Sequence, residues 1–371
     1  MVRLSELDTP FLAVDRDVLE RNLLAMAEMA DERGVALRPH AKTHKTMEIA
    51  RRQIALGAVG LTVATVGEAE AFADGGFDDL FIAYPIWAAG RRGERLRALA
   101  ARVRLSVGVD SPEAAELLGT ALAGTSAQAV VEVDSGHHRS GIHPAEAGSV
   151  AVAAERAGLP VAGAFTFPGH GYGPGNRGVA VADEARALAE AAAALRSHGV
   201  EPALRSGGST PTAGLAAGDA GREGVAGGDA AGEGVTELRP GVYVFNDAQQ
   251  VELGSADWSG VALTAVATVV SRRDNAVVVD AGSKTLGADQ AGWATGAGRL
   301  PDHPEARVVA LSEHHATVAF PPGAEIPALG SRVRVAPNHV CTAVNLADEL
   351  IVIAGGQVVD RWPVAARGMN R

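Results

Sequence analysis

The sequence has a single cysteine, Cys341, so no disulfide can form within the chain. No run of 18 apolar residues occurs, and the first residues lack the apolar stretch of a signal peptide, so we expect neither a membrane span nor export. The net charge is −11, and the sequence contains no basic patch of the kind that binds nucleic acid. These absences predict a cytoplasmic protein that binds neither membranes nor nucleic acids.

Lysine is also scarce, because only Lys42, Lys45 and Lys284 stand among 33 basic residues. A strong preference for arginine makes each retained lysine a candidate for chemistry that arginine cannot perform. Two of the three lie close together, in the stretch Arg-Pro-His-Ala-Lys-Thr-His-Lys at 38–45. This stretch is therefore the first candidate for a functional site.

The 371 residues are 47% hydrophobic and 21% charged, which is typical of a folded chain of about two domains. Short apolar runs alternate with amphipathic or alanine-rich stretches, and this alternation predicts a parallel sheet. Eight such repeats favour a (β/α)8 TIM-type barrel over residues 16–246. The eight predicted strands cover residues 36–42, 61–65, 80–85, 104–110, 129–134, 161–167, 203–207 and 236–245.

The pattern changes after residue 246, where short strands follow one another without a long helical period. We predict a mostly antiparallel β domain over 247–371, joined by residues 1–15 through a strand at 11–15. Its strands are expected at 261–270, 276–280, 308–311, 317–320, 332–335, 349–353 and 357–362. The glycine-rich segment 213–234 is too poor in large aliphatic residues to pack a core, so we interpret it as a flexible insertion.

In a TIM-type barrel the chemistry lies at the carboxyl ends of the strands. Lys42 ends the first predicted strand, where it could form a Schiff base or, equally, a surface ion pair. The seventh strand ends in Ser206-Gly207-Gly208-Ser209, and Gly241 and Tyr243 lie in the eighth. Phosphate sites of such barrels commonly lie after these two strands. A strand-end lysine together with a glycine-rich phosphate loop indicates pyridoxal phosphate.

Four stretches, RPHAKTHK, SGGSTPT, RPGVYVFND and PNHVCTAVNL, resemble the D-serine dehydratase and D-threonine aldolase family of fold-type III pyridoxal-phosphate enzymes. The resemblance covers the chain except for the glycine-rich insertion. It implies a homodimer acting on a small D-hydroxy amino acid. It also implies that Lys42 is the Schiff-base lysine, that Arg139 lies near the phenolic oxygen of the cofactor and that Tyr172 lies near its pyridine ring. The residues that it places around the phosphate are Ser206, Gly207, Gly208, Ser209, Gly241 and Tyr243.

His339 and Cys341 are two residues apart, which on a strand places both side chains on one face. Imidazole and thiolate suit zinc, although a packed cysteine beside a histidine is the commoner meaning of such a pair. The resemblance implies that they are metal ligands, and zinc is the metal we expect, with another divalent ion as the alternative. Relatives that are aldolases tend to have aspartate in place of this cysteine, so the pair favours a dehydratase.

The resulting hypothesis is β-elimination from a D-β-hydroxy amino acid, giving a keto acid and ammonia. Freed Lys42 would remove the Cα proton, and zinc would assist loss of the β-hydroxyl group. The main competing hypothesis is a retro-aldol enzyme acting on D-threonine or 3-hydroxy-D-aspartate, with His315 as the base. The sequence also allows an amino acid racemase, a decarboxylase or a non-catalytic carrier of pyridoxal phosphate.

Overall fold

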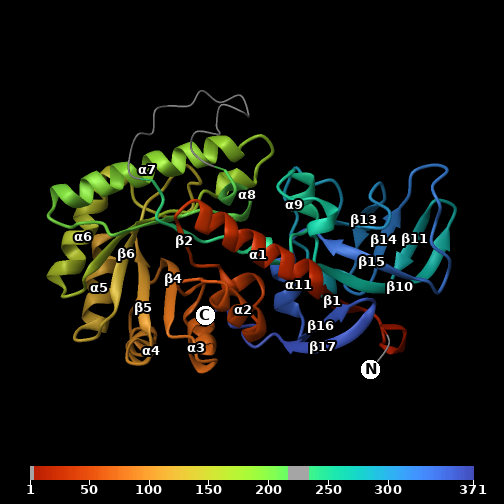
Figure 1. Ribbon diagram of the computed structural model, residues 1–371, viewed down its shortest axis with the longest axis horizontal. Helices are drawn as coiled ribbons and strands as arrows, with labels where there is room; N and C mark the ends of the chain where they lie inside the picture. The colour runs from red at the N-terminus through yellow and green to blue at the C-terminus, as the bar shows by residue number, and fades with distance from the viewer. Residues whose placement is uncertain (1–3, 216–233) are drawn as a thin grey trace. The chain divides into compact units, whose positions relative to one another are not determined.

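The computed structural model of the protein describes residues 4–215 and 234–371 (Figure 1). The chain divides into two compact units and crosses between them more than once. The barrel unit consists of Ala27–Lys42, Ala50–Gly241 and Met369–Arg371. The β unit consists of Met1–Met26, Thr43–Ile49 and Val242–Gly368. Of the predicted insertion 213–234, all but the two ends lies outside the described residues.

The barrel unit contains a parallel sheet whose strands follow the order β2-β9-β8-β7-β6-β5-β4-β3. A parallel bridge between His40 and Thr62 joins the two ends of this order, so the sheet closes on itself. The predicted (β/α)8 barrel is thereby confirmed. The strands are β2 (Ala36–Leu37), β3 (Leu61–Val63), β4 (Asp79–Pro85), β5 (Arg104–Val109), β6 (Gln128–Glu132), β7 (Val161–Phe165), β8 (Leu204–Gly207) and β9 (Glu237–Leu238).

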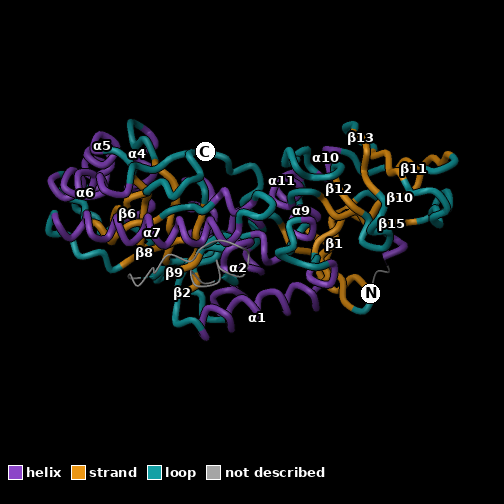
Figure 2. Tube along the Cα trace, turned by 90° about the horizontal axis from the view of Figure 1, so that it is seen from above, coloured by secondary structure: helices purple, strands orange, loops and turns teal. Residues whose placement is uncertain are grey.

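Helices lie outside these strands, as α5 and α6 do beside β6 in Figure 2. Among the described residues, no helix is both long enough and apolar enough to cross a membrane. The helices are α1 (Arg16–Glu32), α2 (Met47–Ala55), α3 (Val66–Asp74), α4 (Arg91–Ala100), α5 (Pro112–Leu122), α6 (Ala147–Arg156), α7 (Arg177–Ser197), α8 (Thr210–Ala213), α9 (Ala248–Glu252), α10 (Ser283–Leu286) and α11 (Val340–Leu346).

Two predicted strands are much shorter in the structure, and each ends two residues before a proline. The strand predicted at 36–42 ends at Leu37, two residues before Pro39, which has no N–H group to donate to the sheet. The strand predicted at 236–245 ends at Leu238, two residues before Pro240. Lys42 therefore lies in a 3-10 turn, Ala41–Thr43, and not at a strand end. Tyr243 likewise lies in a 3-10 turn and not in a strand.

The β unit is built on a mostly antiparallel sheet, as predicted, with the strand order β13-β14-β11-β10-β1-β16-β17. Strand β15 pairs with β10 and β12. Strand β1, from the start of the chain, pairs antiparallel with β10 and parallel with β16. The strands are β1 (Phe11–Asp15), β10 (Leu263–Arg273), β11 (Ala276–Val279), β12 (Gly298–Arg299), β13 (Arg307–Leu311), β14 (Ala316–Ala319), β15 (Arg332–Pro337), β16 (Glu349–Ala354) and β17 (Gln357–Pro363).

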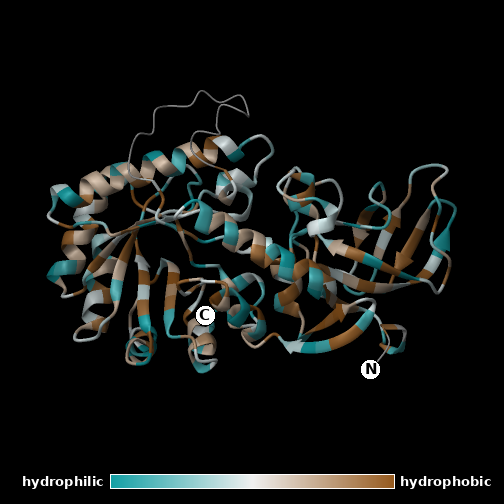
Figure 3. Cartoon of the chain, viewed as in Figure 1, coloured by the Kyte–Doolittle hydropathy of each residue, from teal (hydrophilic) through white to brown (hydrophobic). Residues whose placement is uncertain are grey.

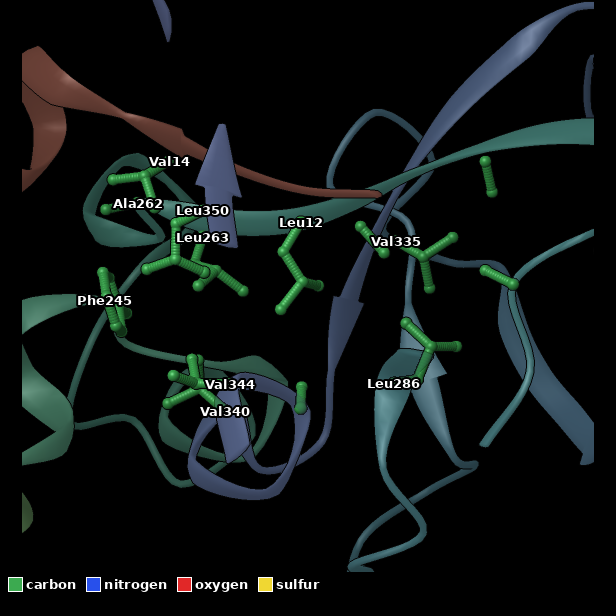
Figure 4. Packing of buried hydrophobic residues seen from close by; sticks show 14 of the residues in the cluster. Leu12, Val14, Phe245, Ala262, Leu263, Leu286, Val335, Val340, Val344 and Leu350 are labelled. Atoms are coloured by element: carbon green, nitrogen blue, oxygen red, sulfur yellow. The ribbon is translucent and has the colours of Figure 1, made fainter. Parts of the chain in front are cut away.

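Hydrophobic residues line the strands of the β unit (Figure 3) and form one continuous buried cluster. Val340 and Val344 of helix α11 belong to this cluster together with Phe245 and Leu350 (Figure 4). The two valines are four residues apart, so they share one face of the helix. Packing of that face fixes the helix on the core, and the half-buried Cys341 also packs against this cluster.

Candidate active site

The Lys42 turn joins the two compact units, since the chain leaves the barrel unit after Lys42. The Lys42 side chain is half-buried, whereas the four residues that follow, Thr43 to Thr46, are buried. Within this stretch, the backbone N–H of Thr46 donates a hydrogen bond to Nδ1 of His44 over 3.2 Å. A half-buried lysine next to a buried and hydrogen-bonded stretch is well suited to covalent chemistry, because its backbone is held in place.

The glycine-rich loop follows β8 directly and lies beside the end of β9. These strands pair in parallel, with Ser206 opposite Glu237 and Gly207 opposite Leu238. Gly208 has φ of +78°, and a Cβ atom there would lie 2.6 Å from Cδ2 of Leu238. A Cβ atom on Gly207 would lie 2.2 Å from the Glu184 carboxylate. Only glycine fits at these two positions, so the backbone itself forms the surface of the loop.

Ser209 begins the short helix α8 and completes this loop. Its backbone N–H and side-chain oxygen both contact Oγ1 of Thr212 at 2.9 Å, in a reciprocal capping arrangement. Gly241 lies three residues beyond the end of β9, at the same edge of the sheet. The structure thus brings Gly207, Gly208, Ser209 and Gly241 to one edge of the barrel. Tyr243 is buried and packs in the hydrophobic cluster of the β unit.

Ser206 points into a buried ionic network in the barrel. Its hydroxyl donates to Oε1 of Glu237 over 2.6 Å and accepts a hydrogen bond from Arg239. Oε2 of Glu237 accepts from Arg38 over 2.7 Å, and Arg239 also donates to the Thr166 carbonyl over 2.6 Å. Buried charges need such partners, because an unpaired charge away from water is very unfavourable. The network therefore holds the ends of β8 and β9 in place.

Arg139 and Tyr172 come from the loops that follow β6 and β7, and both lie against Phe167. The guanidinium carbon of Arg139 lies 5.0 Å from the centre of the Phe167 ring. The centres of the Phe167 and Tyr172 rings are 6.1 Å apart. The structure thus gathers two predicted cofactor contacts around an aromatic residue that the sequence analysis did not single out.

Beside them, the Glu132 carboxyl group is 2% exposed at the end of β6. Oε1 accepts a hydrogen bond from the Ser140 hydroxyl over 3.0 Å, but Oε2 has no hydrogen-bond partner among the described residues. Burial raises the pKa of Glu132 to about 7. The small cavity next to it is also lined by Arg139, Thr166 and Phe167. A buried oxygen without a partner, close to an exposed arginine, indicates space for a polar group that the polypeptide does not supply.

His339 and Cys341 flank the start of helix α11 in the β unit. The sequence predicted both on one strand, but β15 ends at Pro337, so His339 is the residue that begins the helix and Cys341 lies in its first turn. The two side chains nevertheless interact: the negative charge of the Cys341 thiolate, helped by a hydrogen bond that the His339 imidazole donates to the sulfur, raises the pKa of His339. The His339 side chain is 28% exposed. Among the described residues, no group of three or more His, Cys, Asp or Glu side chains is arranged to hold a metal ion.

Asp247 lies behind this pair and is fully buried. Its Oδ2 lies 3.3 Å from Nδ1 of His339 and accepts the backbone N–H of Val340 over 3.2 Å. Its Oδ1 accepts the backbone N–H of Gln250 over 2.9 Å, at the start of α9. The carboxylate is thereby held in one orientation, and it turns Nε2 of His339 away from itself.

Comparison with known proteins decides the family. A model of the alanine racemase N-terminal domain matches residues 14–249, and a serine dehydratase domain model matches residues 262–353. The chain is 34% identical to the D-threonine aldolase of Arthrobacter sp, over 99% of this chain and 95% of that protein. The chain belongs to the D-serine dehydratase and D-threonine aldolase family of fold-type III pyridoxal-phosphate enzymes. It is therefore a pyridoxal-phosphate-dependent lyase, and the racemase, decarboxylase and carrier hypotheses are set aside.

Other members of the family are dehydratases. The D-threo-3-hydroxyaspartate dehydratase of Delftia sp. (strain HT23) is 33% identical, over 96% of this chain and 97% of that protein. A solved structure of such a dehydratase, with a cysteine replaced by alanine and in the metal-free form, matches with a TM-score of 0.85 and 29% identity. That match covers 98% of this chain and 99% of the other. The family thus includes both elimination and aldol enzymes.

The residues present fit the cofactor of this family. The loop at Gly207 and Gly208 has no side chains of its own, as close approach of a phosphate to the backbone requires, and the Gly208 N–H donates to the buried Glu184 carboxylate. The unpartnered oxygen of Glu132 lies near Arg139, and a polar group of the cofactor suits that space. Both observations lie in the barrel unit.

His315, the base expected for retro-aldol cleavage, lies in the exposed turn between β13 and β14. Its backbone carbonyl accepts the N–H of Ser312 over 2.8 Å. Among the described residues, no hydrogen bond or ion pair joins its imidazole to His339 or Cys341. Its role as a base stays a prediction.

The sequence analysis missed Asp247, Glu132 and Phe167. Asp247 ends the stretch RPGVYVFND, which carried the family resemblance, and an aspartate directly before a short helix is a typical capping residue. That signal predicts that Asp247 caps the helix, but it does not predict that the same carboxylate also contacts His339. Glu132 stands two residues before Asp134 at a strand end, where its burial could not be read from spacing.

Proposed function

We propose that the protein is a zinc-dependent D-serine dehydratase-like lyase, which converts a D-β-hydroxy amino acid to a keto acid and ammonia. The observation that carries the proposal is the His339–Cys341 pair with the buried Asp247 carboxylate behind the imidazole. A sulfur ligand suits zinc better than magnesium or manganese. The metal-free cysteine variant of a dehydratase relative supports a metal role for cysteine in this family.

Residues of the barrel unit would hold the cofactor. Lys42 would attach it, Gly207, Gly208, Ser209 and Gly241 would surround its phosphate, and Arg139 and Tyr172 would contact its ring. When bound, pyridoxal phosphate supplies an electron sink for the charge left at Cα. We assign Ser206 a supporting role, since its hydroxyl is already bonded to Glu237 and Arg239. Tyr243 has a similar supporting role, because it packs in the hydrophobic cluster.

The remaining steps fall to side chains of this chain. Nζ of Lys42 would accept the proton from Cα of the substrate. His339 and Cys341 would hold the metal, and two protein ligands would be compatible with a catalytic metal, which needs positions for water and substrate. Lewis acidity toward the β-hydroxyl group is the chemistry that zinc supplies there. The homodimer and the cytoplasmic location expected from the sequence belong to this proposal as well.

Product analysis tests the proposed reaction. Purified protein with pyridoxal phosphate receives D-serine, D-threonine or 3-hydroxy-D-aspartate, each with and without a zinc chelator, and the products are identified by mass spectrometry. We expect a keto acid and ammonia, lost when the chelator is present. Glycine and an aldehyde would instead establish retro-aldol cleavage, which the 34% identity to a D-threonine aldolase keeps as the second candidate.

Replacing Asp247 by asparagine should weaken zinc binding by about 10–100-fold, the usual effect of losing an outer partner of a metal-bound histidine. The asparagine keeps the size of the side chain but removes the charge beside His339. The zinc dissociation constant is measured by competition with a chromogenic chelator. Asp257→Asn is the control, because Asp257 also caps a turn in the β unit but, among the described residues, bonds to Ser259 and Gly260 and not to His339. Equal zinc affinity in the two variants would rule out this role.

A further inference from the structure

The segment that follows Lys42 is tied twice to helix α11. The Cys341 sulfur and Oγ1 of Thr43 are hydrogen-bonded over 3.4 Å. Two residues further along, Nζ of Lys45 donates to Oδ1 of Asn345 over 2.6 Å. Cys341 and Asn345 are four residues apart and therefore lie on the same face of the helix. One face of α11 thus carries both a predicted metal ligand and the acceptor for Lys45.

Lys45 is an unusual residue to find in this position. Its side chain is buried, at 4% exposure, and its ammonium group donates to the side-chain amide of Asn345. Its backbone has φ of +51°, a conformation that residues other than glycine rarely adopt. Burying an ammonium group is unfavourable unless it is well bonded, and lysine is among the residues least often buried. The buried ammonium group and the positive φ of Lys45 both indicate that this stretch of backbone is held in one specific arrangement.

Further hydrogen bonds hold the two partners in place. The Lys45 carbonyl accepts the backbone N–H of Ala366 over 3.1 Å. Oδ1 of Asn345 also accepts the backbone N–H of Gly368 over 3.1 Å. Thr43, Lys45, α11 and these two residues all belong to the β unit. Lys42 precedes Thr43 directly, so its Cα atom lies about 3.8 Å from that of Thr43.

We propose that Lys45 and Asn345 are positioning residues that couple the metal pair to Lys42. This inference rests on the proposed function. A metal held by His339 and Cys341 restricts the first turn of α11. The Thr43 and Lys45 contacts pass that restriction to the turn that carries Lys42. Because coupling between two sites is reciprocal, zinc and pyridoxal phosphate then change each other's affinity by the same factor.

The test measures this factor on the full-length protein. Zinc affinity is determined by chelator competition without and with saturating pyridoxal phosphate, and cofactor affinity is determined from its absorbance without and with zinc. We expect a factor of about 5–150 in the wild type, the usual range for coupled sites. Asn345→Leu and Lys45→Met should each bring the factor close to one. Asn345→Asp, which keeps an acceptor for Lys45 and Gly368, should retain it.

Asn22→Leu is the matched control. Asn22 is also a half-buried asparagine of the β unit with two hydrogen bonds, to the carbonyls of Val244 and Gly260, but it is not bonded to α11. Its loss should leave the coupling factor unchanged, and circular dichroism verifies that each variant is folded. A factor of one in the wild type, or an unchanged factor in folded Asn345→Leu, overturns the inference while the metal site stands. Absence of zinc binding that depends on His339 overturns the proposed function as well.

Discussion

Lys42→Ala should abolish both the absorption band of the bound cofactor and turnover. The variant lacks the amine to which the cofactor attaches, and it also lacks the base that we assign to the Cα proton. Absorption spectra of the protein after dialysis, together with product formation, measure the two losses. Removal of a residue with both roles costs several orders of magnitude in rate, about a thousandfold or more.

The scarcity of lysine makes the control simple. Lys284→Ala should behave as wild type, because Lys284 is exposed and forms an ion pair with Glu313 over 3.0 Å. Borohydride reduction followed by peptide mass spectrometry should locate the cofactor on Lys42 in the wild type. Attachment at Lys45 would show that the wrong lysine of the turn has been assigned.

The barrel could be predicted from the sequence because its signal is repeated. Eight apolar runs separated by helical stretches leave few other architectures, and all eight occur as neighbours in one sheet. The ends of β2 and β9 were harder to predict from the sequence. Strand β2 ends at Leu37 and β9 at Leu238, although the N–H groups of Arg38 and His40 still donate to the carbonyls of Leu238 and Pro240. Pro39 and Pro240 have no N–H group to donate. Apolar patterning reports burial, whereas strand length depends on individual hydrogen bonds.

Only part of the candidate site could be predicted from the sequence, for a related reason. Spacing placed His339 and Cys341 together, and they are close in the structure, although across a helix start and not along a strand. Spacing could not place Asp247 behind His339, since the two residues are 92 positions apart. The same limit applies to Lys45 and Asn345. Such contacts are set by tertiary packing, and local patterns carry no information about them.

Cys341→Ala should remove zinc and reduce elimination by about a thousandfold or more, while pyridoxal phosphate still binds at saturating concentration. One ligand from the histidine alone cannot retain the metal, and without Lewis acid assistance hydroxide is a poor leaving group. Zinc content is measured by atomic spectrometry, cofactor binding by absorbance, and elimination by keto acid formation.

Thr342→Ala provides the control for this variant, because Thr342 is the next residue of α11 and its hydroxyl bonds to Asp289. It should keep both zinc and activity, which would show that the helix tolerates a small truncation at this end. Full turnover by Cys341→Ala in the presence of chelator would exclude the metal role. The His-x-Cys pair would then be a packed cysteine beside a histidine, and Lys42 with the barrel residues would have to carry the reaction without a metal.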